Sequence, residues 1–257
     1  MLRALLLALA CAAAAVAAAG AGRPGVVLTA SPASLAVGSG ERRTIRVANA
    51  GAEPLVVDVV RAALALGPSG RPQVVLSGGA RGDAGFVRVR PRRLVLGPGA
   101  SAALTVVSAP PHGARPGDHA ALVLLQTQPA GAGRVGVRMR IGITVLVRVA
   151  GTIRHRLAVR GVRVRRVPGK RVLEVSIANT GNAVEWLRHE RLAVLLVAHG
   201  RVVARLRPPA REVLPGARAV VGVVYRGTVR GAATARVVLG HGRDGRETLR
   251  RSFRVRL

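Results

Sequence analysis

Aromatic, acidic and cysteine residues are all scarce in this 257-residue chain. Aromatic residues make up 2%, which argues against a protein that stacks single-stranded nucleic acid on aromatic side chains. The single cysteine, Cys11, excludes a disulfide-stapled scaffold. Only 11 acidic residues oppose 41 basic ones, and all the basic residues except Lys170 are arginine. Hydrophobic residues make up 49%, so a packed core is expected rather than wholesale disorder.

The composition also indicates the source of the sequence. Abundant Ala, Val, Gly and Arg, with little Lys, Asn and Ile, are typical of a GC-rich bacterium. Part of the formal net charge of +30 therefore reflects codon bias rather than selection for a charged ligand. The remainder leaves open an attraction to polyanions such as teichoic acids, anionic glycans, acidic lipid headgroups or acidic proteins.

Residues 1–21 have the pattern of a cleaved signal peptide. A short basic start ending at Arg3 precedes an apolar run of Ala and Leu over 4–19, and A-x-A cleavage sites follow at 17–19 and 19–21. The run is short and rich in Ala for a membrane span. A lipobox ending at Cys11 is the alternative. Cleavage would remove Cys11 and Arg3, lowering the charge to 30 − 1 = +29. We expect an exported protein, extracellular or associated with the cell envelope, without a membrane span in its mature form.

The rest of the chain has the period of β-strands. Apolar and polar residues alternate with period two over 43–49, 86–90, 135–149, 162–167 and 253–257. Valine is abundant, and Asn-Gly and Pro-Gly turn signals recur between these runs. Short strands at this spacing predict an all-β fold of the sandwich type.

An internal sequence repeat predicts two such sandwiches in tandem. The Asn49 corner (VANAG) matches the Asn179 corner (IANTG), and a Pro-Gly turn follows each, at Gly99 and Gly216. Because order and approximate spacing both repeat, we expect two immunoglobulin-like domains, at 24–150 and 152–257. The alternative is chance, since both turn types are common in β proteins.

Three details complete the expected fold. Ala62–Leu66 and Val184–Leu192 are candidates for a helical turn or two. Trp186, which lies between apolar stretches, is expected to anchor the core of the second domain.

Catalytic and metal-binding patterns are missing from the sequence. No G-x-S-x-G motif is present, and no serine is presented to the one Asp-His pair, Asp118-His119. We expect Asp118 to cap the Pro116-Gly117 turn through its own backbone. The six histidines have no metal-ligand spacing, and no carboxylate pair can be nominated. The prediction is a non-enzyme without cofactor or metal.

Several segments resemble a known family. The first domain resembles the peptidoglycan-binding domain of WxL-interacting cell-surface proteins, which is similar to the first domain of PapD-like pilus chaperones, and the second resembles the domain that usually follows. The segments that carry the resemblance are Pro32–Asn49, Val89–Val106, Gly117–Ala120, Arg138–Gly151, Asn179–Asn182 and Leu214–Gly216. PapD-like chaperones anchor a subunit carboxylate with a cleft Arg and Lys. In this chain the Lys position falls at Thr144, and the Arg position falls near Pro32.

Two surfaces are candidates for partner binding. The long alternating strand 135–149 is the best candidate for an exposed sheet edge that adds a partner strand, through Arg138, Arg140, Ile143, Val145 and Val147. Arginines two apart share one strand face, and this spacing nominates polyanion contacts at Arg154, Arg156, Arg163 and Arg165. A solvated strand face explains the same spacing.

The resemblance implies an exported envelope protein that contacts peptidoglycan or another surface protein. The expected partner is a cell-wall polymer or a surface protein; no nucleic acid is expected, and the oligomeric state stays open. The alternative is a PapD-like periplasmic chaperone for surface-fibre subunits. A small envelope hydrolase is a third possibility, disfavoured by the missing nucleophile.

Overall fold

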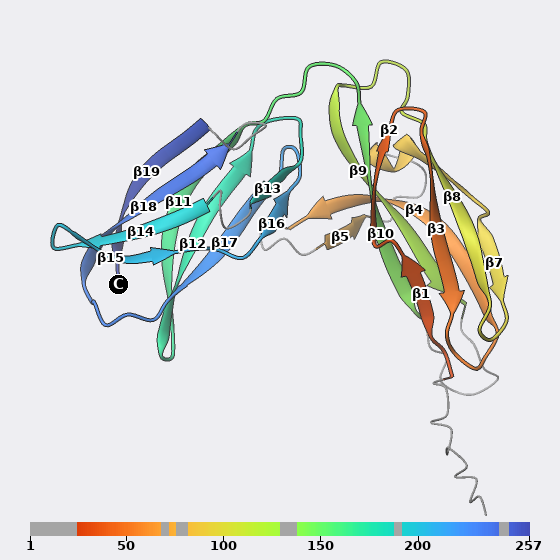
Figure 1. Cartoon of the computed structure of the whole chain (residues 1–257), viewed down its shortest axis with the longest axis horizontal. Helices are drawn as coiled ribbons and strands as arrows, with labels where there is room; N and C mark the ends of the chain where they lie inside the picture. Colours follow the sequence, from red (N-terminus) through yellow and green to blue (C-terminus); the bar gives the residue numbers. More distant parts are fainter. Residues whose placement is uncertain (1–24, 68–71, 76–81, 129–137, 188–191, 242–246) are drawn as a thin grey trace, which may run out of the picture.

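A computed structural model describes residues 25–67, 72–75, 82–128, 138–187, 192–241 and 247–257. The expected signal peptide lies outside them. The described elements are strands and one 3-10 helix, η1 (Gly82–Phe86). Within these ranges, no helix is long and apolar enough to cross a membrane. Figure 1 shows two groups of sheets set at an angle. Residues 150–156, called the connection below, join them between β10 (Arg140–Val149) and β11 (Leu157–Val167).

The first group is a sandwich of two sheets. One sheet has the strand order β1-β3-β8-β6, and the other has the order β2-β10-β9-β4-β5, with β7 paired to β4. Their inner faces enclose one hydrophobic core, which includes Ile45, Leu104 and Ile143. The strands are β1 (Leu28–Ser31), β2 (Ser34–Gly38), β3 (Arg42–Asn49), β4 (Leu55–Leu66), β5 (Pro72–Val75), β6 (Val87–Arg90), β7 (Arg93–Leu96), β8 (Ser101–Ser108), β9 (Gly117–Thr127) and β10 (Arg140–Val149).

The second group encloses a separate core, which includes Leu173, Leu196 and Val237. Its sheets have the orders β11-β12-β17, β15-β14-β18-β19 and β13-β16. The strands are β11 (Leu157–Val167), β12 (Lys170–Asn179), β13 (Glu185–Leu187), β14 (Leu192–Ala198), β15 (Arg201–Leu206), β16 (Arg211–Val213), β17 (Arg218–Tyr225), β18 (Ala232–His241) and β19 (Glu247–Arg256). The all-β prediction of immunoglobulin-like sandwiches is confirmed, and the boundaries 24–150 and 152–257 stay a proposal.

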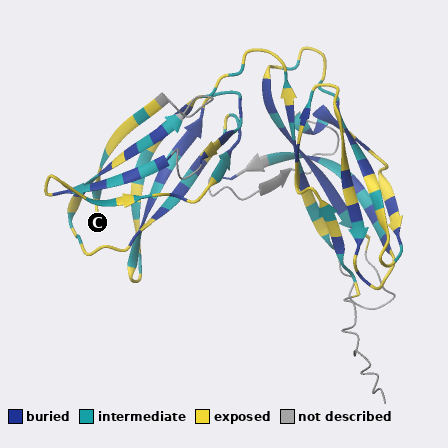
Figure 2. Cartoon of the chain, in the orientation of Figure 1, coloured by how far each residue is buried: buried dark blue, intermediate teal, exposed yellow. Residues whose placement is uncertain are grey.

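The period-two pattern produces these strands because alternate side chains enter the core. In β14, Leu192, Val194 and Leu196 are fully buried while the residues between them are half-buried, and Figure 2 shows this alternation along many strands. The expected helical turns are wrong. Ala62–Leu66 continues β4, and Glu185–Leu187 is β13, because both segments pair in sheets. The rest of Val184–Leu192 lies partly outside the described residues.

The internal sequence repeat corresponds to two corners with the same hydrogen bonds, one in each sandwich. The Asn49 amide donates to the Glu53 and Leu96 carbonyls at 2.7 and 3.1 Å, and its oxygen accepts from Gly51 N–H at 3.0 Å. The Asn179 amide donates to the Ala183 and Val213 carbonyls at 2.7 and 3.0 Å, and its oxygen accepts from Gly181 N–H at 3.0 Å. The Pro-Gly turns close on the same corners, since Gly99 N–H donates to Asn49 O and Gly216 N–H to Asn179 O.

Candidate functional site

A buried carboxylate connects the two sandwiches. Asp118, on β9, is 8% exposed, and it accepts two hydrogen bonds from Arg148 on β10, at 2.6 Å from Nε and 2.7 Å from Nη2. Its second oxygen also accepts from the Val184 N–H of the second sandwich, at 2.7 Å. The hydrogen bond to Asp118 raises the pKa of the Arg148 guanidinium further above its usual range. The expectation that Asp118 caps its own turn is wrong, because these distant partners take up its carboxylate.

Asn182 binds the connection and the first sandwich together. Its amide donates to the Pro116 and Thr152 carbonyls at 2.8 and 2.9 Å, and its side-chain oxygen accepts from Arg154 N–H at 2.6 Å. Its backbone carbonyl accepts from Asp118 N–H at 2.7 Å. Gly117 has a φ of +133°, and a Cβ there would collide with the Asn182 carbonyl. Glycine is therefore required at this contact between the two sandwiches.

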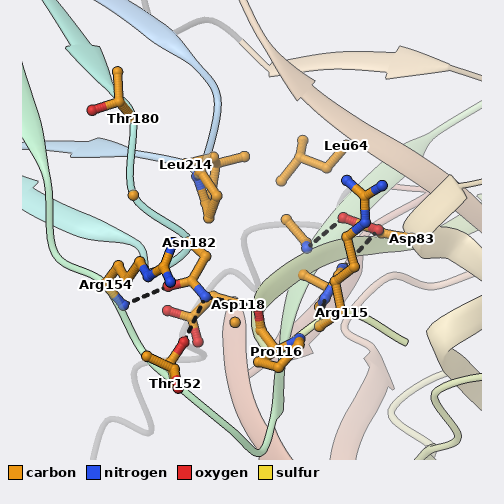
Figure 3. Close-up of a pocket in the computed structure, with 15 residues that line it drawn as sticks. Leu64, Asp83, Arg115, Pro116, Asp118, Thr152, Arg154, Thr180, Asn182 and Leu214 are labelled. Atoms are coloured by element: carbon orange, nitrogen blue, oxygen red, sulfur yellow. Dashed lines mark hydrogen bonds and ion pairs between the residues drawn. The ribbon is translucent and has the colours of Figure 1, made fainter. Parts of the chain in front are cut away.

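A cleft of about 570 Å³ lies at this junction (Figure 3). Its lining comes from β4, η1, the start of β9 with the two residues before it, the connection, Thr180–Asn182 and the turn after β16. It includes Leu64, Asp83, Arg115, Asp118, His119, Thr152, Arg154, Thr180, Asn182 and Leu214. Arg115 and Arg154 are exposed. Among the described residues, neither guanidinium makes a hydrogen bond or ion pair. The cleft can therefore attract an anionic group such as a carboxylate.

The Asp118-His119 pair does not form a catalytic dyad. The two residues point to opposite faces of β9, and His119 Nδ1 lies 3.0 Å from Asp83 Oδ1 while Nε2 lies 2.9 Å from the Arg115 carbonyl. Both ring nitrogens therefore lie within hydrogen-bond distance of oxygen atoms of the protein, and neither lies against Asp118. The ring stacks on Phe86 at 4.2 Å between centroids. Within the described ranges, no three His, Cys, Asp or Glu residues lie close enough together to hold a metal ion.

The β13-β16 ribbon carries an exposed tryptophan and a half-buried acid. Trp186 is 50% exposed and lies opposite Glu212, because Glu185 and Leu187 take the inward positions of β13. The expectation that Trp186 anchors the core is wrong. Burial, and secondarily the charge of Asp118, raises the pKa of the Glu212 carboxyl. Among the described residues, its Oε1 has no hydrogen-bond partner.

The β10 edge is open over only half of its length. β10 pairs with β9 from Arg140 to Val149, and with β2 from Thr144 to Arg148. The prediction of an exposed edge is therefore wrong for Thr144–Arg148. Over Arg140–Ile143, β10 has a strand partner on one side only, among the residues that the structure describes.

The geometry identifies which backbone groups face the open side. Thr144 N–H donates toward β2, to the Ala33 carbonyl at 3.2 Å. Because strand backbone groups alternate in direction, the N–H and C=O groups of Arg140 and Gly142 also face that side. Those of Ile141 and Ile143 face β9. The open half-edge therefore offers the backbone of two residues, Arg140 and Gly142.

The residues nominated for the partner strand divide into two groups. Arg138 and Arg140 are exposed, at the open half of the edge. Ile143, Val145 and Val147 are fully buried in the first core, where their side chains hold the strand in place. A partner strand at this edge would pair with backbone rather than contact these three side chains.

The residues nominated for polyanion contact lie in three places. Arg154 and Arg156 precede β11 in the connection, so the expectation that they share a strand face is wrong; their carbonyls accept from the Asn182 and Thr180 N–H groups. Arg154 lines the cleft, and Arg156 lines a separate groove of about 410 Å³ beside Arg160 and Arg251. Arg163 and Arg165 do lie on β11, where Arg165 Nε binds Glu174 Oε1 at 2.7 Å.

Sequence reasoning missed the Asp118–Arg148–Val184 junction. The partners of Asp118 lie 30 and 66 residues further along the chain, and no local spacing connects them. Asp83 was also missed as the partner of His119, because the two residues lie 36 positions apart in the chain.

The comparisons with known proteins concern this two-sandwich fold. No protein-family model matches the sequence, and no curated protein matches it either. A chain from the solved chaperone-tip adhesin complex of CFA/I fimbriae biogenesis matches with a TM-score of 0.54 and 12% identity, over 88% of this chain and 98% of that chain. The class 5 fimbriae chaperone CfaA matches with a TM-score of 0.50 and 12% identity, over the same shares.

At this low identity the similarity concerns the fold alone. The chain has the PapD-like immunoglobulin fold found in fimbrial chaperones. That part of the predicted resemblance is supported, and the resemblance to WxL-interacting proteins stays a prediction.

Proposed function

We propose that this protein is an exported, non-enzymatic chaperone of the PapD-like class. It holds a subunit of a surface fibre by pairing a strand of that subunit with the open half of β10. The observation that carries the proposal is the uneven pairing of β10, whose Arg140–Ile143 half lacks a second strand partner among the described residues. An unpaired edge of this kind binds an extended segment through main-chain hydrogen bonds.

Three further features support this function. The two-sandwich fold matches a chain of the chaperone-tip adhesin complex over nearly its whole length. The Asp118–Arg148–Val184 junction ties the sandwiches together, so a partner that touches both meets a preformed surface. The core residues Ile143 and Val145 fix the β10 strand and reduce the entropy lost on binding.

The cleft supplies the positive charge that the Thr144 position lacks. Thr144 is half-buried between its pairing partners Ser34 and Leu122 and carries no charge. Arg115 and Arg154 instead line the cleft at the ends of the two sandwiches. In this proposal they attract an acidic group of the bound subunit.

The experiment compares two substitutions of one residue. Gly142→Pro removes a backbone N–H that faces the open side and leaves the β9 ladder intact. Gly142→Ala keeps that N–H and adds the Cβ alone, which meets the Leu122 Cδ1 methyl at 3.3 Å. Co-expression with a strand-deficient fibre subunit from the same source should give copurification with the wild type and the alanine variant. The proline variant should lose it, and retention by a folded proline variant contradicts strand addition.

Contact with peptidoglycan, which the sequence resemblance implies, is tested separately. Pelleting with purified sacculi that persists in high salt would support a specific contact with peptidoglycan. Pelleting that disappears with screening would show only the attraction of a basic chain to an anionic polymer.

A further inference from the structure

The outer face of the β15-β14-β18-β19 sheet gathers arginines that are distant in sequence. Residues paired across strands lie on the same face. Arg236 on β18 lies opposite Ser252 on β19, and Arg250 and Arg254 flank that position on the same strand. Arg256 lies on the same face of β19. Arg205 on β15 and Arg236 on β18 both pair with Leu195 of β14, one from each side. We define the basic face as Arg205, Arg236, Arg250, Arg254 and Arg256.

This face is turned to solvent. The alternate residues of β18, such as Ala235 and Val237, are buried in the second core, so the arginine positions point outward. All five arginines are exposed. The diagonal neighbours Arg250 and Arg254 lie about 7–8 Å from Arg236 at their Cα atoms, where like charges repel.

Among the side chains that the structure describes, no carboxylate relieves this repulsion. The acids of the second sandwich whose side chains the structure describes are Glu174, Glu185 and Glu212, on β12, β13 and β16, outside this sheet. Glu247 begins β19, where its position pairs with His241 and alternates with the positions of the basic face. None of the ion pairs between described residues includes an arginine of the basic face. An external anion would therefore remove an unfavourable charge arrangement as well as make new contacts.

Apolar side chains run between the arginines. Leu195 and Val197 on β14 and Val238 on β18 are half-buried on the same face, with Arg205 on one side and the β18-β19 arginines on the other. Val202, which pairs with Val197, is 58% exposed. The face thus combines a central apolar strip with Arg205 on one side and the other four arginines on the other.

We propose that the basic face docks on the headgroup layer of an anionic phospholipid membrane. Surfaces that lie at the lipid interface place apolar residues toward the acyl boundary and arginines at the headgroups, as this sheet does. A linear polyanion would satisfy the arginines but leave the strip of Leu195, Val197 and Val202 without a partner. The face belongs to the second sandwich, so this proposal stands independently of strand addition at β10.

The test uses vesicle flotation with the mature chain. The probes are vesicles of phosphatidylcholine alone and of equal parts phosphatidylcholine and phosphatidylglycerol. The first variant, Arg236→Glu/Arg254→Glu, reverses two charges of the basic face. The matched control, Arg88→Glu/Arg90→Glu, makes the same change of net charge on exposed positions of β6 in the first sandwich. A third variant, Val202→Ser, shortens the apolar strip without changing charge.

The wild type should float with anionic vesicles and not with neutral ones. The Arg236/Arg254 variant should lose about tenfold or more of this binding, while the Arg88/Arg90 control stays within about twofold of the wild type. Val202→Ser should bind several-fold more weakly, and circular dichroism should show each variant folded. Equal loss in both charge-reversal variants would overturn the proposal, since net charge alone would then explain binding. Two other results would overturn it: wild-type binding to polyglutamate but not to vesicles, and vesicle binding that is unchanged in Val202→Ser.

Discussion

Arg148 and Asp118 face each other across β10 and β9, and the carboxylate that receives both guanidinium hydrogen bonds also receives the Val184 N–H of the second sandwich. One buried side chain therefore links the strand that carries the open half-edge to the neighbouring sandwich. The Asp118 side chain is 5% exposed and the Arg148 side chain is 57% exposed, so water reaches the guanidinium but hardly the carboxylate.

Replacing Asp118 tests this link. Asp118→Asn should lower the free energy of unfolding by about 2 kcal/mol, because hydrogen bonds to a charged group are lost in a buried site. It should also speed proteolysis in the connection at 150–156. Asp58→Asn is the control; its ion pair with Arg93 is more exposed and should contribute under about 1 kcal/mol. Equal losses in the two variants would show that the junction adds no special stability.

The repeated asparagine corners predict matched effects in the two sandwiches. Asn49→Ala and Asn179→Ala each remove side-chain hydrogen bonds to buried backbone, and each should cost about 3 kcal/mol in denaturant unfolding. Thr29→Ala, which removes an exposed hydrogen bond to the Ala48 carbonyl, should change stability by under about 0.5 kcal/mol. A neutral result at either asparagine would mean that the two corners are not equivalent supports.

Glu212 predicts a pH-dependent stability effect. Burial first, and Asp118 second, raise the pKa of its carboxyl in the folded protein. The stability linked to this proton is complete below the pKa of the unfolded chain and is lost as pH rises through the higher folded pKa. Glu212→Gln should therefore stabilise the protein at neutral pH, with a gain that shrinks as pH falls.

The measurement is the free energy of unfolding of the wild type and of Glu212→Gln, from neutral pH down to below the pKa of Glu212 in the unfolded chain. Glu174→Gln is the control, since it removes the ion pair with Arg165 and should destabilise slightly. A gain for Glu212→Gln that is the same at all pH values would contradict the account.

The cleft arginines predict a charge-dependent contribution to subunit capture. Arg115→Ala/Arg154→Ala should weaken binding of the copurified subunit by about tenfold, because two positive charges leave the cleft. Arg88→Ala/Arg90→Ala lowers net charge equally on β6 and should leave binding unchanged. Affinity measured at two salt concentrations checks the result; identical behaviour of both double variants would remove the cleft from the binding site.

Local sequence signals predicted the fold well. Period-two alternation placed β3, β6, β10, β11 and β19, because burial of every second residue is a local property of a strand. The repeated corners were visible because Asn49 and Asn179 each bind a glycine N–H two residues away. The expected helical turn at Ala62–Leu66 failed because pairing with β5 and β9 overrides the helix propensity of alanine.

The candidate site depends on pairings that no local pattern carries. An alternating run such as β10 looks the same at an edge and inside a sheet, so the cover of Thr144–Arg148 by β2 could not be read from it. The prediction that Trp186 anchors the core was wrong because Trp186 is the middle residue of a three-residue strand. Its two neighbours point inward, so Trp186 points outward. Asp118 looked like a turn residue, since its local neighbours are Pro116 and Gly117, while Arg148 and Val184 decide its role.

The central claim, strand addition at the open half of β10, is tested most directly by amide hydrogen exchange. In the free protein the N–H groups of Arg140 and Gly142 should exchange fast, and those of Ile141 and Ile143, which face β9, should exchange slowly. Saturation with a captured fibre subunit should slow Arg140 and Gly142 strongly and leave the other two nearly unchanged. A complex that forms while Arg140 and Gly142 exchange as they do in the free protein would contradict the account.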